Sequence, residues 1–594
     1  MPKGKMKQLL DRLTEEMSAA FAAAGYDAAL GKVGVSARQD LGEYQCNGAM
    51  AGVKRYHKSP MAIAGDVVKQ LEGSTVLEQV NVVKPGFINV QVSPIVLRDF
   101  LQEMGKSEKF GMPQNESPKM VILDYGGPNV AKPLHVGHLR SAVIGDSIKR
   151  IVRYHGDTAV GDIHLGDWGL QMGLVITEIK HRKPDLPYFD ETYTGTYPED
   201  VPITVSDLEE IYPSASARSK EDDAYHKEAL ENTAKLQKGD RGCRALWQYI
   251  MKISVADMKR NYANLGVSFD LWNGESTVND LIPGMVEKMK RDGYAYESNG
   301  ALVVDVEDPK DSKAVPPCMI LKSDGAALYT TTDLATIQDR EDRYHPDEII
   351  YITDKRQALH FTQVFRAAKK CGLCPSETSL CHIGFGTVNG KDGKPFKTRE
   401  GGVMRLESLI AEIDEEMLGK IRSNPDIPAD EQNDTAHKIA LSAIKYGDLS
   451  NQASKDYIFD MDKFTSFEGD TGPYILYTIV RIKSILAKYR AAGGKDPKTL
   501  NICVPRSRME KNLMLDIAGF GAMMEEAYEE LAPHRICEYI YSLSNDFNSF
   551  YHETRILTQE DEEKKEGWIA LLDLCCQILE TCIDLLGFEA PDRM

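Results

Sequence analysis

Two histidines lie close together where the sequence changes from a short apolar run to a long amphipathic segment. His135 and His138 flank Gly137 in the string His-Val-Gly-His, and Lys132 precedes them. Imidazole N–H groups can donate to phosphoryl oxygens, a lysine can neutralise phosphate charge, and a glycine lets a ligand approach the backbone closely. The string is not a Walker loop, because no Gly-Lys-Ser/Thr follows it. In isolation it is explained equally well by helix-capping or solvent-facing histidines.

A basic segment far downstream offers further cations. Residues 391–402 hold three lysines, among them Lys394 and Lys397, together with one arginine and three glycines. Such a segment is consistent with a solvated basic hairpin. Opposite a bound nucleotide, its lysines would instead stabilise the negative charge that develops on a polyphosphate.

The elements that must position these residues alternate between strand and helix patterns. Strands are predicted at Met120–Tyr125, Thr158–Ile163, Ala327–Thr331, Glu348–Thr353 and Ser379–Phe385, and helices at His138–Tyr154, Leu334–Tyr344 and Ala358–Lys370. Strand–helix–strand at this spacing indicates parallel βαβ units. Two separated blocks predict an α/β fold, a split doubly wound sheet of Rossmann type, with an insertion at about 180–320 that begins irregular and acidic. His135 and His138 would then lie at a helix N-terminus outside the carboxyl end of a strand, where phosphate binds well.

The remaining chain divides by pattern into terminal domains. The predicted organisation is an α+β N-terminal domain at 1–110 with strands at Val80–Val83 and Phe87–Val92, a catalytic domain at 118–404, connecting helices at 405–455 and an all-α helical bundle at 456–594. In the bundle, aromatic residues such as Phe547, Phe550 and Tyr551 are expected to be packed rather than stacked on bases.

Composition excludes several classes of protein. The chain has 594 residues, a formal net charge of −19, 42% hydrophobic and 27% charged residues, as in soluble globular proteins of several domains. No run approaches the ~18 consecutive apolar residues of a membrane span, and no signal-peptide core follows the basic N-terminus. We therefore expect a cytoplasmic protein that binds no membrane and keeps its 11 cysteines reduced.

One cysteine group has zinc-like spacing. Cys371 and Cys374 are followed closely by Cys381 and His382. Zinc fingers usually separate their ligand pairs by about a dozen residues or more, so this set is too compact. We interpret these cysteines as packed thiols and expect no structural metal.

Longer strings make a family resemblance specific. His135-Val-Gly-His138 resembles the HIGH signature of class I aminoacyl-tRNA synthetases, and Lys394-Pro-Phe-Lys397-Thr398 stands where their KMSKS signature should be. The strings that resemble arginyl-tRNA synthetases in particular are 128–141 (PNVAKPLHVGHLRS), 164–169 (HLGDWG), 328–333 (LYTTTD), 467–474 (FEGDTGPY) and 585–594 (LLGFEAPDRM). They follow the family's order and spacing from about Leu41 to the last residue.

The resemblance implies a two-step reaction. Arginine and ATP, the latter with Mg²⁺, give arginyl-adenylate and pyrophosphate, and the arginyl group passes to the terminal ribose of tRNA(Arg), with activation requiring bound tRNA. It assigns His135, His138 and Gly137 to ATP, and Lys132, Lys394 and Lys397 to its phosphates. Where KMSKS has Met-Ser, this chain has Pro-Phe, so it leaves open which lysine makes the main transition-state contact.

The resemblance also implies an arginine pocket. Asp124, Tyr329 and Asp333 match the positions that hold the guanidinium, and Asn129 and Gln357 match those that hold the α-amino and carboxylate groups. A strand ending at Tyr329 and a helix opening at Asp333 would place both in one pocket. Each acid has a structural alternative: Asp333 could be only a helix N-cap, and Asp124 only a strand-end turn former.

Several alternatives remain at this point. They are a small-molecule nucleotidylyltransferase, a catalytically altered synthetase-like tRNA-binding protein, and another class I specificity. The resemblance implies that the N-terminal domain meets the tRNA elbow and the bundle binds the anticodon; we expect a monomer with no DNA partner. Residues 185–240 carry a net charge of −9 and residues 407–434 a net charge of −7, so tRNA is expected to avoid both segments.

Overall fold

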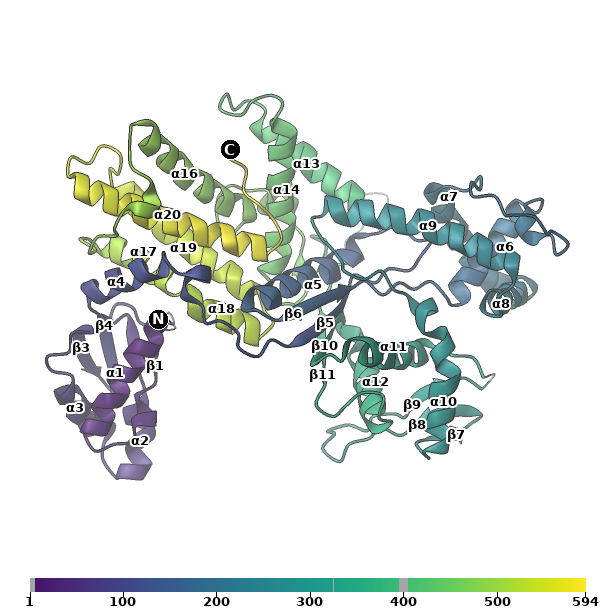
Figure 1. Ribbon diagram of the computed structural model, residues 1–594, viewed down its shortest axis with the longest axis horizontal. Helices are drawn as coiled ribbons and strands as arrows, with labels where there is room; N and C mark the ends of the chain where they lie inside the picture. Colours follow the sequence, from purple (N-terminus) through teal and green to yellow (C-terminus); the bar gives the residue numbers. More distant parts are fainter. Residues whose placement is uncertain (1–5, 324, 395–403) are drawn as a thin grey trace. The chain divides into compact units, whose positions relative to one another are not determined.

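A computed structural model describes residues 6–323, 325–394 and 404–594, which form two compact units (Figure 1). One unit contains the described residues of 116–466 together with Leu585–Phe588. The other contains residues 6–115, Phe467–Asp584 and Glu589–Met594. Within these described residues, every helix is too short or too polar to cross a bilayer. Lys397 and the residues beside it, 395–403, lie outside the description.

A four-stranded parallel sheet forms the centre of the 116–466 unit. Its strands, in the spatial order β11-β10-β5-β6, are β11 (Ser379–Phe385), β10 (Glu348–Asp354), β5 (Met120–Tyr125) and β6 (Thr158–Asp162). The apolar runs that predicted these strands are buried inside the sheet, as expected for parallel strands covered on both faces. The Rossmann-type sheet is therefore confirmed.

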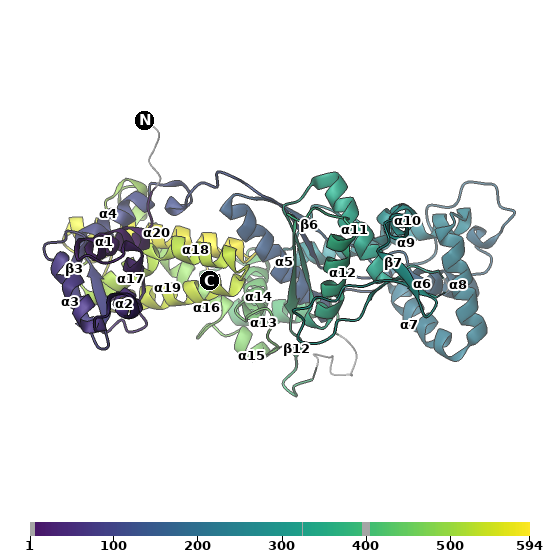
Figure 2. The same ribbon diagram turned by 90° about the horizontal axis from the view of Figure 1, so that it is seen from below.

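Helices cover both faces of this sheet. Helix α5 (Val136–His155) joins β5 to β6, while α12 (Ala358–Lys370) joins β10 to β11 in the opposite direction along the sheet. Right-handed crossovers in opposite directions place the two helices on opposite faces. Figure 2 shows α5 on one side of the sheet and α12, with α11 (Tyr329–Tyr344), on the other.

The strand predicted at Ala327–Thr331 is wrong, because helix α11 begins at Tyr329. The three successive threonines favour a strand by propensity. Their hydroxyls instead bond the backbone around the helix start: Thr331 Oγ1 accepts from the Leu328 N–H at 3.0 Å and donates to the Ile320 carbonyl at 2.5 Å. Tertiary contacts thus override the local preference.

The insertion is more ordered than predicted. It begins at the end of α6 (Leu170–Arg182) and comprises α7 (Val205–Glu221), α8 (Asp223–Gln237), α9 (Arg241–Asn264), α10 (Ile282–Arg291) and an antiparallel sheet of β7 (Ala295–Ser298), β8 (Ala301–Val304) and β9 (Cys318–Leu321). The irregular start predicted for this region is wrong over α7. Pro213 suggests a break, but a Thr204–Asp207 capping box starts the helix and the proline is accommodated inside it.

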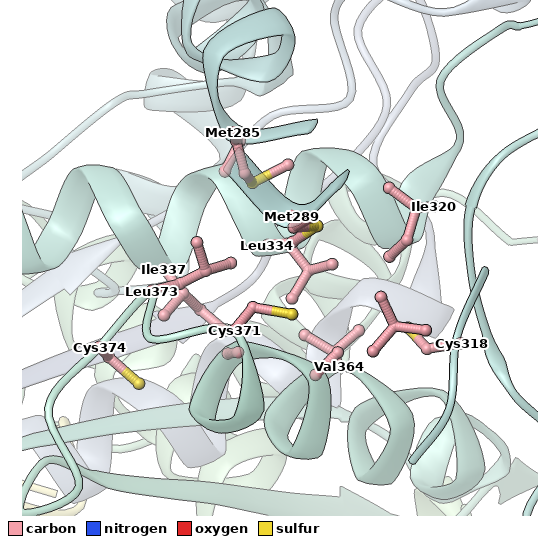
Figure 3. Close-up of a cluster of buried hydrophobic side chains, with 14 of the residues drawn as sticks. Met285, Met289, Cys318, Ile320, Leu334, Ile337, Val364, Cys371, Leu373 and Cys374 are labelled. Atoms are coloured by element: carbon pink, nitrogen blue, oxygen red, sulfur yellow. The ribbon is translucent and has the colours of Figure 1, made fainter. Parts of the chain in front are cut away.

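A buried apolar cluster between the insertion and the sheet contains two of the cysteines that have zinc-like spacing in the sequence. Cys371 and Cys374 lie among Met285, Met289 and Leu334 (Figure 3). Burial raises the pKa of the Cys371 thiol to about 11. His382 instead stacks on Phe361, with ring centroids 4.6 Å apart. The packed-thiol interpretation is confirmed for Cys371 and Cys374.

The end of the 116–466 unit returns to α5 and the sheet. Its elements are β12 (Val388–Asn389), α13 (Leu406–Ile421), α14 (Gln432–Leu449), β13 (Tyr457–Ile458) and α15 (Met461–Phe464). Strands β12 and β13 pair in parallel, with Val388 opposite Tyr457.

The other unit combines a small sheet with a helical bundle. The sheet orders its strands β1-β2-β4-β3, namely β1 (Val33–Val35), β2 (Tyr44–Cys46), β4 (Phe87–Val92) and β3 (Leu77–Val83). Helices α1 (Leu9–Ala23), α2 (Gly48–Tyr56), α3 (Pro60–Gln70) and α4 (Pro94–Met104) accompany it, and α16 (Gly472–Ala491), α17 (Arg508–Ala518), α18 (Phe520–Glu529), α19 (Pro533–Glu553) and α20 (Glu562–Leu585) form the bundle. Phe547 and Phe550 are buried, as predicted, whereas Tyr551 is 36% exposed and lies near Arg481.

Candidate active site

The two signature histidines form the N-terminal cap of α5. His135 is the N-cap residue, and its Nδ1 accepts a hydrogen bond from the Gly137 N–H at 3.0 Å. His138 completes the cap because its Nδ1 accepts from the His135 N–H at 3.1 Å. Their ring centroids are 4.0 Å apart. Since a Cβ at position 137 would lie 2.6 Å from His135 Cε1, the glycine is needed to make room for the capping ring.

This cap leaves both imidazoles ready to donate. Burial lowers the pKa of His135, and it lowers the pKa of His138 to about 3. Both rings are therefore neutral near pH 7. Because Nδ1 accepts in each ring, the single proton of each neutral imidazole must reside on Nε2. Two Nε2–H donors thus stand at a helix N-terminus, the combination that suits phosphoryl oxygens.

The loop between β5 and α5 holds two further predicted residues. Lys132 Nζ lies 4.1 Å from the centroid of the Tyr212 ring, on α7. Asn129 forms a parallel bridge with Gly166, in the loop after β6. A Cβ at Gly166 would lie 2.2 Å from Asn129 Oδ1, so this glycine is required for the close approach of the two loops.

The basic segment is described only at its ends. At the first end, the Lys394 N–H donates to Asp392 Oδ1 at 3.1 Å. At the other, the Val136 N–H donates to the Met404 carbonyl and the Leu406 N–H to the Leu134 carbonyl, both at 3.0 Å. The chain that leaves the basic segment therefore lies directly against the histidine cap. Met404 and the histidine cap, about 270 residues apart in the sequence, are therefore in direct contact.

Asp124 lies on the predicted edge of the sheet but already has a guanidinium partner. It stands opposite Asp162 on β6, and Arg340 Nη2, from α11, lies 2.7 Å from Asp124 and 2.8 Å from Asp162. The Arg340 side chain is only 3% exposed. Burial raises the pKa of Asp124, and the charge of Arg340 opposes that rise.

His164 extends this cluster beyond β6. Burial alone would lower the pKa of His164, but the nearby carboxylates of Asp162, whose Oδ2 lies 3.8 Å from His164 Nδ1, and of Asp124 raise it above its usual value. Its Nε2 also lies 3.3 Å from Thr336 Oγ1 on α11. The acids at the carboxyl ends of β5 and β6 are therefore balanced by cationic groups of the chain itself.

Tyr329 and Asp333 lie one turn apart on α11 rather than at a strand end and a helix start. Spacing of four residues still places both on one helix face. The Tyr329 side chain is 69% exposed, and Asp333 Oδ2 lies 2.5 Å from His360 Nε2 on α12. Gln357 is exposed in the short 3₁₀ turn Lys355–Gln357 that follows β10.

Glu275 is an acid of this site that sequence reasoning missed. It begins the 3₁₀ helix Glu275–Leu281, which packs on α11. Burial raises its pKa to about 7, with Asp333 adding to the rise and His164 opposing it. Glu275 follows no strand and belongs to no recognised motif, so the signal that reveals it is its burial beside other titratable groups.

These residues gather at the carboxyl edge of the sheet, where open α/β sheets bind ligands. One side presents neutral phosphate donors, and the other presents carboxyl groups with a tyrosine. No group of three or more His, Cys, Asp or Glu suited to a metal ion occurs among the described residues. The arrangement can bind a polyphosphate next to a cationic small molecule.

Comparison with known families covers nearly the whole chain. The model described as "tRNA synthetases class I (R), catalytic domain" matches residues 101–461. The "DALR anticodon binding domain" matches residues 475–594, and the "Arginyl tRNA synthetase N terminal domain" matches residues 7–92.

Individual relatives agree. An arginine–tRNA ligase of Agathobacter rectalis is 57% identical over 99% of this chain and 100% of its own length, and one of Alkaliphilus oremlandii is 51% identical over 99% and 100%. Among solved structures, arginyl-tRNA synthetase from Plasmodium falciparum has a TM-score of 0.80 at 24% identity and that from Thermus thermophilus 0.76 at 24%, each covering 99% of this chain and 100% of its own. At that identity the structures show the fold.

Proposed function

The chain belongs to the arginyl-tRNA synthetase family, and we propose that the edge of its parallel sheet binds ATP and L-arginine as follows. The activity is ligation of arginine to tRNA(Arg) at the expense of ATP. Neither step of that reaction requires a nucleophile from the protein. Positioning and electrostatic stabilisation of the α-phosphate transition state carry the rate.

The phosphate half of the site is assigned to α5 and the basic segment. His135 and His138 donate from Nε2 to the triphosphate, and Lys132, Lys394 and Lys397 neutralise its charge. The observation that carries this proposal is the reciprocal cap, in which Nδ1 of each ring accepts a backbone N–H, so that the proton of each neutral ring is left on Nε2. Mg²⁺ enters bound to the phosphates of ATP, as is usual for this ion.

The amino-acid half is assigned to α11 and the turns beside it. Asp333, Glu275 and Tyr329 receive the guanidinium of arginine, because Asp333 and Glu275 are acids that no arginine or lysine of the described residues is shown to pair with. Asn129 and Gln357 hold the α-amino and carboxylate groups. Asp124 keeps its place in the pocket, but its pairing with Arg340 favours a role beside the α-amino group rather than as the main guanidinium partner.

The remaining partners follow the domain matches. The helical bundle binds the anticodon and the N-terminal module the tRNA elbow, while the acidic segments 185–240 and 407–434 face away from the RNA. We further propose that the protein acts as a cytoplasmic monomer and binds no DNA.

Arginine-dependent ATP–pyrophosphate exchange tests this function. We expect exchange with arginine in the presence of tRNA(Arg), and little without it. Lysine and citrulline are the matched controls, since one keeps the charge without the planar fork and the other keeps the shape without the charge. Exchange supported equally by either analogue would contradict the proposed pocket.

A further inference from the structure

A second buried arginine, Arg140, lies just beyond the histidine cap on α5. Its side chain is 1% exposed, and Nε lies 3.1 Å from Asp448 Oδ2 on α14. Its Nη1 donates at 2.9 Å to two carbonyl oxygens, those of Gly386 and Lys455. Arg140 therefore joins α5 to three separate segments of the same unit.

The two carbonyls belong to the root of the basic segment. Gly386 lies two residues before β12, from which the chain enters residues 391–402, and Lys455 lies two residues before β13, the partner strand of β12. The segments around Gly386 and Lys455 approach so closely that a Cβ at Gly386 would lie 2.5 Å from the Lys455 carbonyl oxygen. Asp456 Oδ1 reinforces the contact by accepting from the Thr387 N–H at 2.7 Å.

The other end of the basic segment is also attached to α5. Met404 and Leu406 exchange backbone hydrogen bonds with Val136 and Leu134, which flank the capping residue His135. Residues 134–140, at the start of α5, thus carry the two histidines and also contact the described chain before and after the basic segment.

We propose that Arg140 is a positioning residue, which sets the root of the basic segment relative to His135 and His138 for the activation step. Its planar fork satisfies two carbonyls and a carboxylate at fixed angles, which a lysine cannot reproduce. Asp448 is fully buried and also accepts from the Tyr457 hydroxyl at 2.9 Å, so the fork itself is held in place. The inference rests on the proposed phosphate site.

A purely structural role for Arg140 has to be separated from this positioning role. The matched control is Asp146, a carboxylate on the same helix that is 2% exposed and paired with Lys149 at 3.2 Å and Arg150 at 2.8 Å. The partners of Asp146 within the described residues, Lys149, Arg150 and the Ser268 N–H, all lie away from the basic segment and the histidine cap. Asp146→Asn and Asp448→Asn therefore remove the same charge from equally buried sites of one unit.

The experiment measures arginine-dependent ATP–pyrophosphate exchange of the full chain with tRNA(Arg), together with urea unfolding. For Arg140→Lys and Asp448→Asn we expect kcat to fall ~10- to 100-fold, as for misplaced catalytic groups, with the KM for arginine within about twofold. Asp146→Asn should lose comparable stability with little change in kcat. Gly386→Ala, which displaces the root while residue 140 stays arginine, should reproduce the kcat loss.

A double-mutant cycle tests whether Arg140 affects kcat through the lysines of the basic segment. When Lys394 and Lys397 are both alanine, Arg140→Lys should lower kcat by no more than about twofold, because the groups it positions are gone. An equal loss with and without the lysines, full activity of the lysine-free variant, or a kcat for Asp146→Asn as low as for Asp448→Asn would overturn the proposal. Exchange by the wild-type chain tests the function itself, so the two failures are distinguishable.

Discussion

The two halves of the candidate active site are prepared for their ligands in opposite ways. In the phosphate half, the two donors that cap α5 are neutral rings, whose partners are backbone N–H groups within three residues. The acids of the amino-acid half instead have partners from distant parts of the chain, as in the Arg340 pair with Asp124 and Asp162.

This difference has a physical basis. Neutral donors can be oriented by local backbone geometry and pay little for leaving water. Buried carboxylates require a compensating charge before any ligand arrives, since an unpaired ion in the interior is costly. The guanidinium of Arg340 stabilises the acids of the sheet edge and leaves the acids of α11 and Glu275 for a cationic ligand.

The largest effect is expected when that internal compensation is removed. Arg340→Met leaves Asp124 and Asp162 with His164 as their remaining cationic neighbour, and the free energy of unfolding in urea should fall by about 3–5 kcal/mol. The control is Arg343→Met on the same helix, whose pair with Asp339 involves an arginine that is 53% exposed; it should cost under about 1 kcal/mol. Equal losses for the two variants would show that the buried cluster is not specially dependent on Arg340.

The phosphate half should respond in rate rather than in stability. His138→Ala removes an Nε2–H donor, and kcat for arginine activation should fall ~10²- to 10³-fold with a nearly constant KM for arginine, because the donor acts on the transition state. Steady-state exchange kinetics provide the measurement. A variant with normal kcat and a raised arginine KM would show that His138 contacts arginine rather than the phosphates.

The amino-acid half should respond in substrate affinity. Asp333→Ala removes a carboxylate from α11, so the KM for arginine should rise ~10- to 100-fold, as for a lost charge-assisted hydrogen bond. Binding of tRNA(Arg), measured by filter retention, should stay near normal. Unchanged arginine kinetics would show that Asp333 does not bind arginine and serves only as the partner of His360.

The same contrast explains what could be predicted from the sequence. The strands, α5 and the histidine cap follow from local patterns, because periodicity, a glycine and capping residues all lie within a few positions of one another. Helix α11 begins inside the predicted strand Ala327–Thr331, because Thr331 donates to the Ile320 carbonyl, a contact that the local pattern does not reveal. The partners of Asp124 and the role of Glu275 could not be predicted, because both depend on residues that only the fold brings together.

The smallest effect expected is a pH dependence that separates Glu275 from the other acids. Its pKa of about 7 in the folded protein lies above the ~4.3 of a free glutamate, so burial favours the protonated form. Below pH 7 the carboxyl is therefore neutral, and above pH 7 it ionises and adds a negative charge to the pocket. The KM for arginine should fall several-fold between pH 6 and pH 8, less than the effect of deleting Asp333.

Glu275→Gln should abolish this slope, whereas Glu287→Gln, at a side chain that is 71% exposed on α10, should keep it. An identical pH profile in wild type and Glu275→Gln would mean that Glu275 does not contact the cationic substrate, and that the charge of the amino-acid half comes from α11 alone.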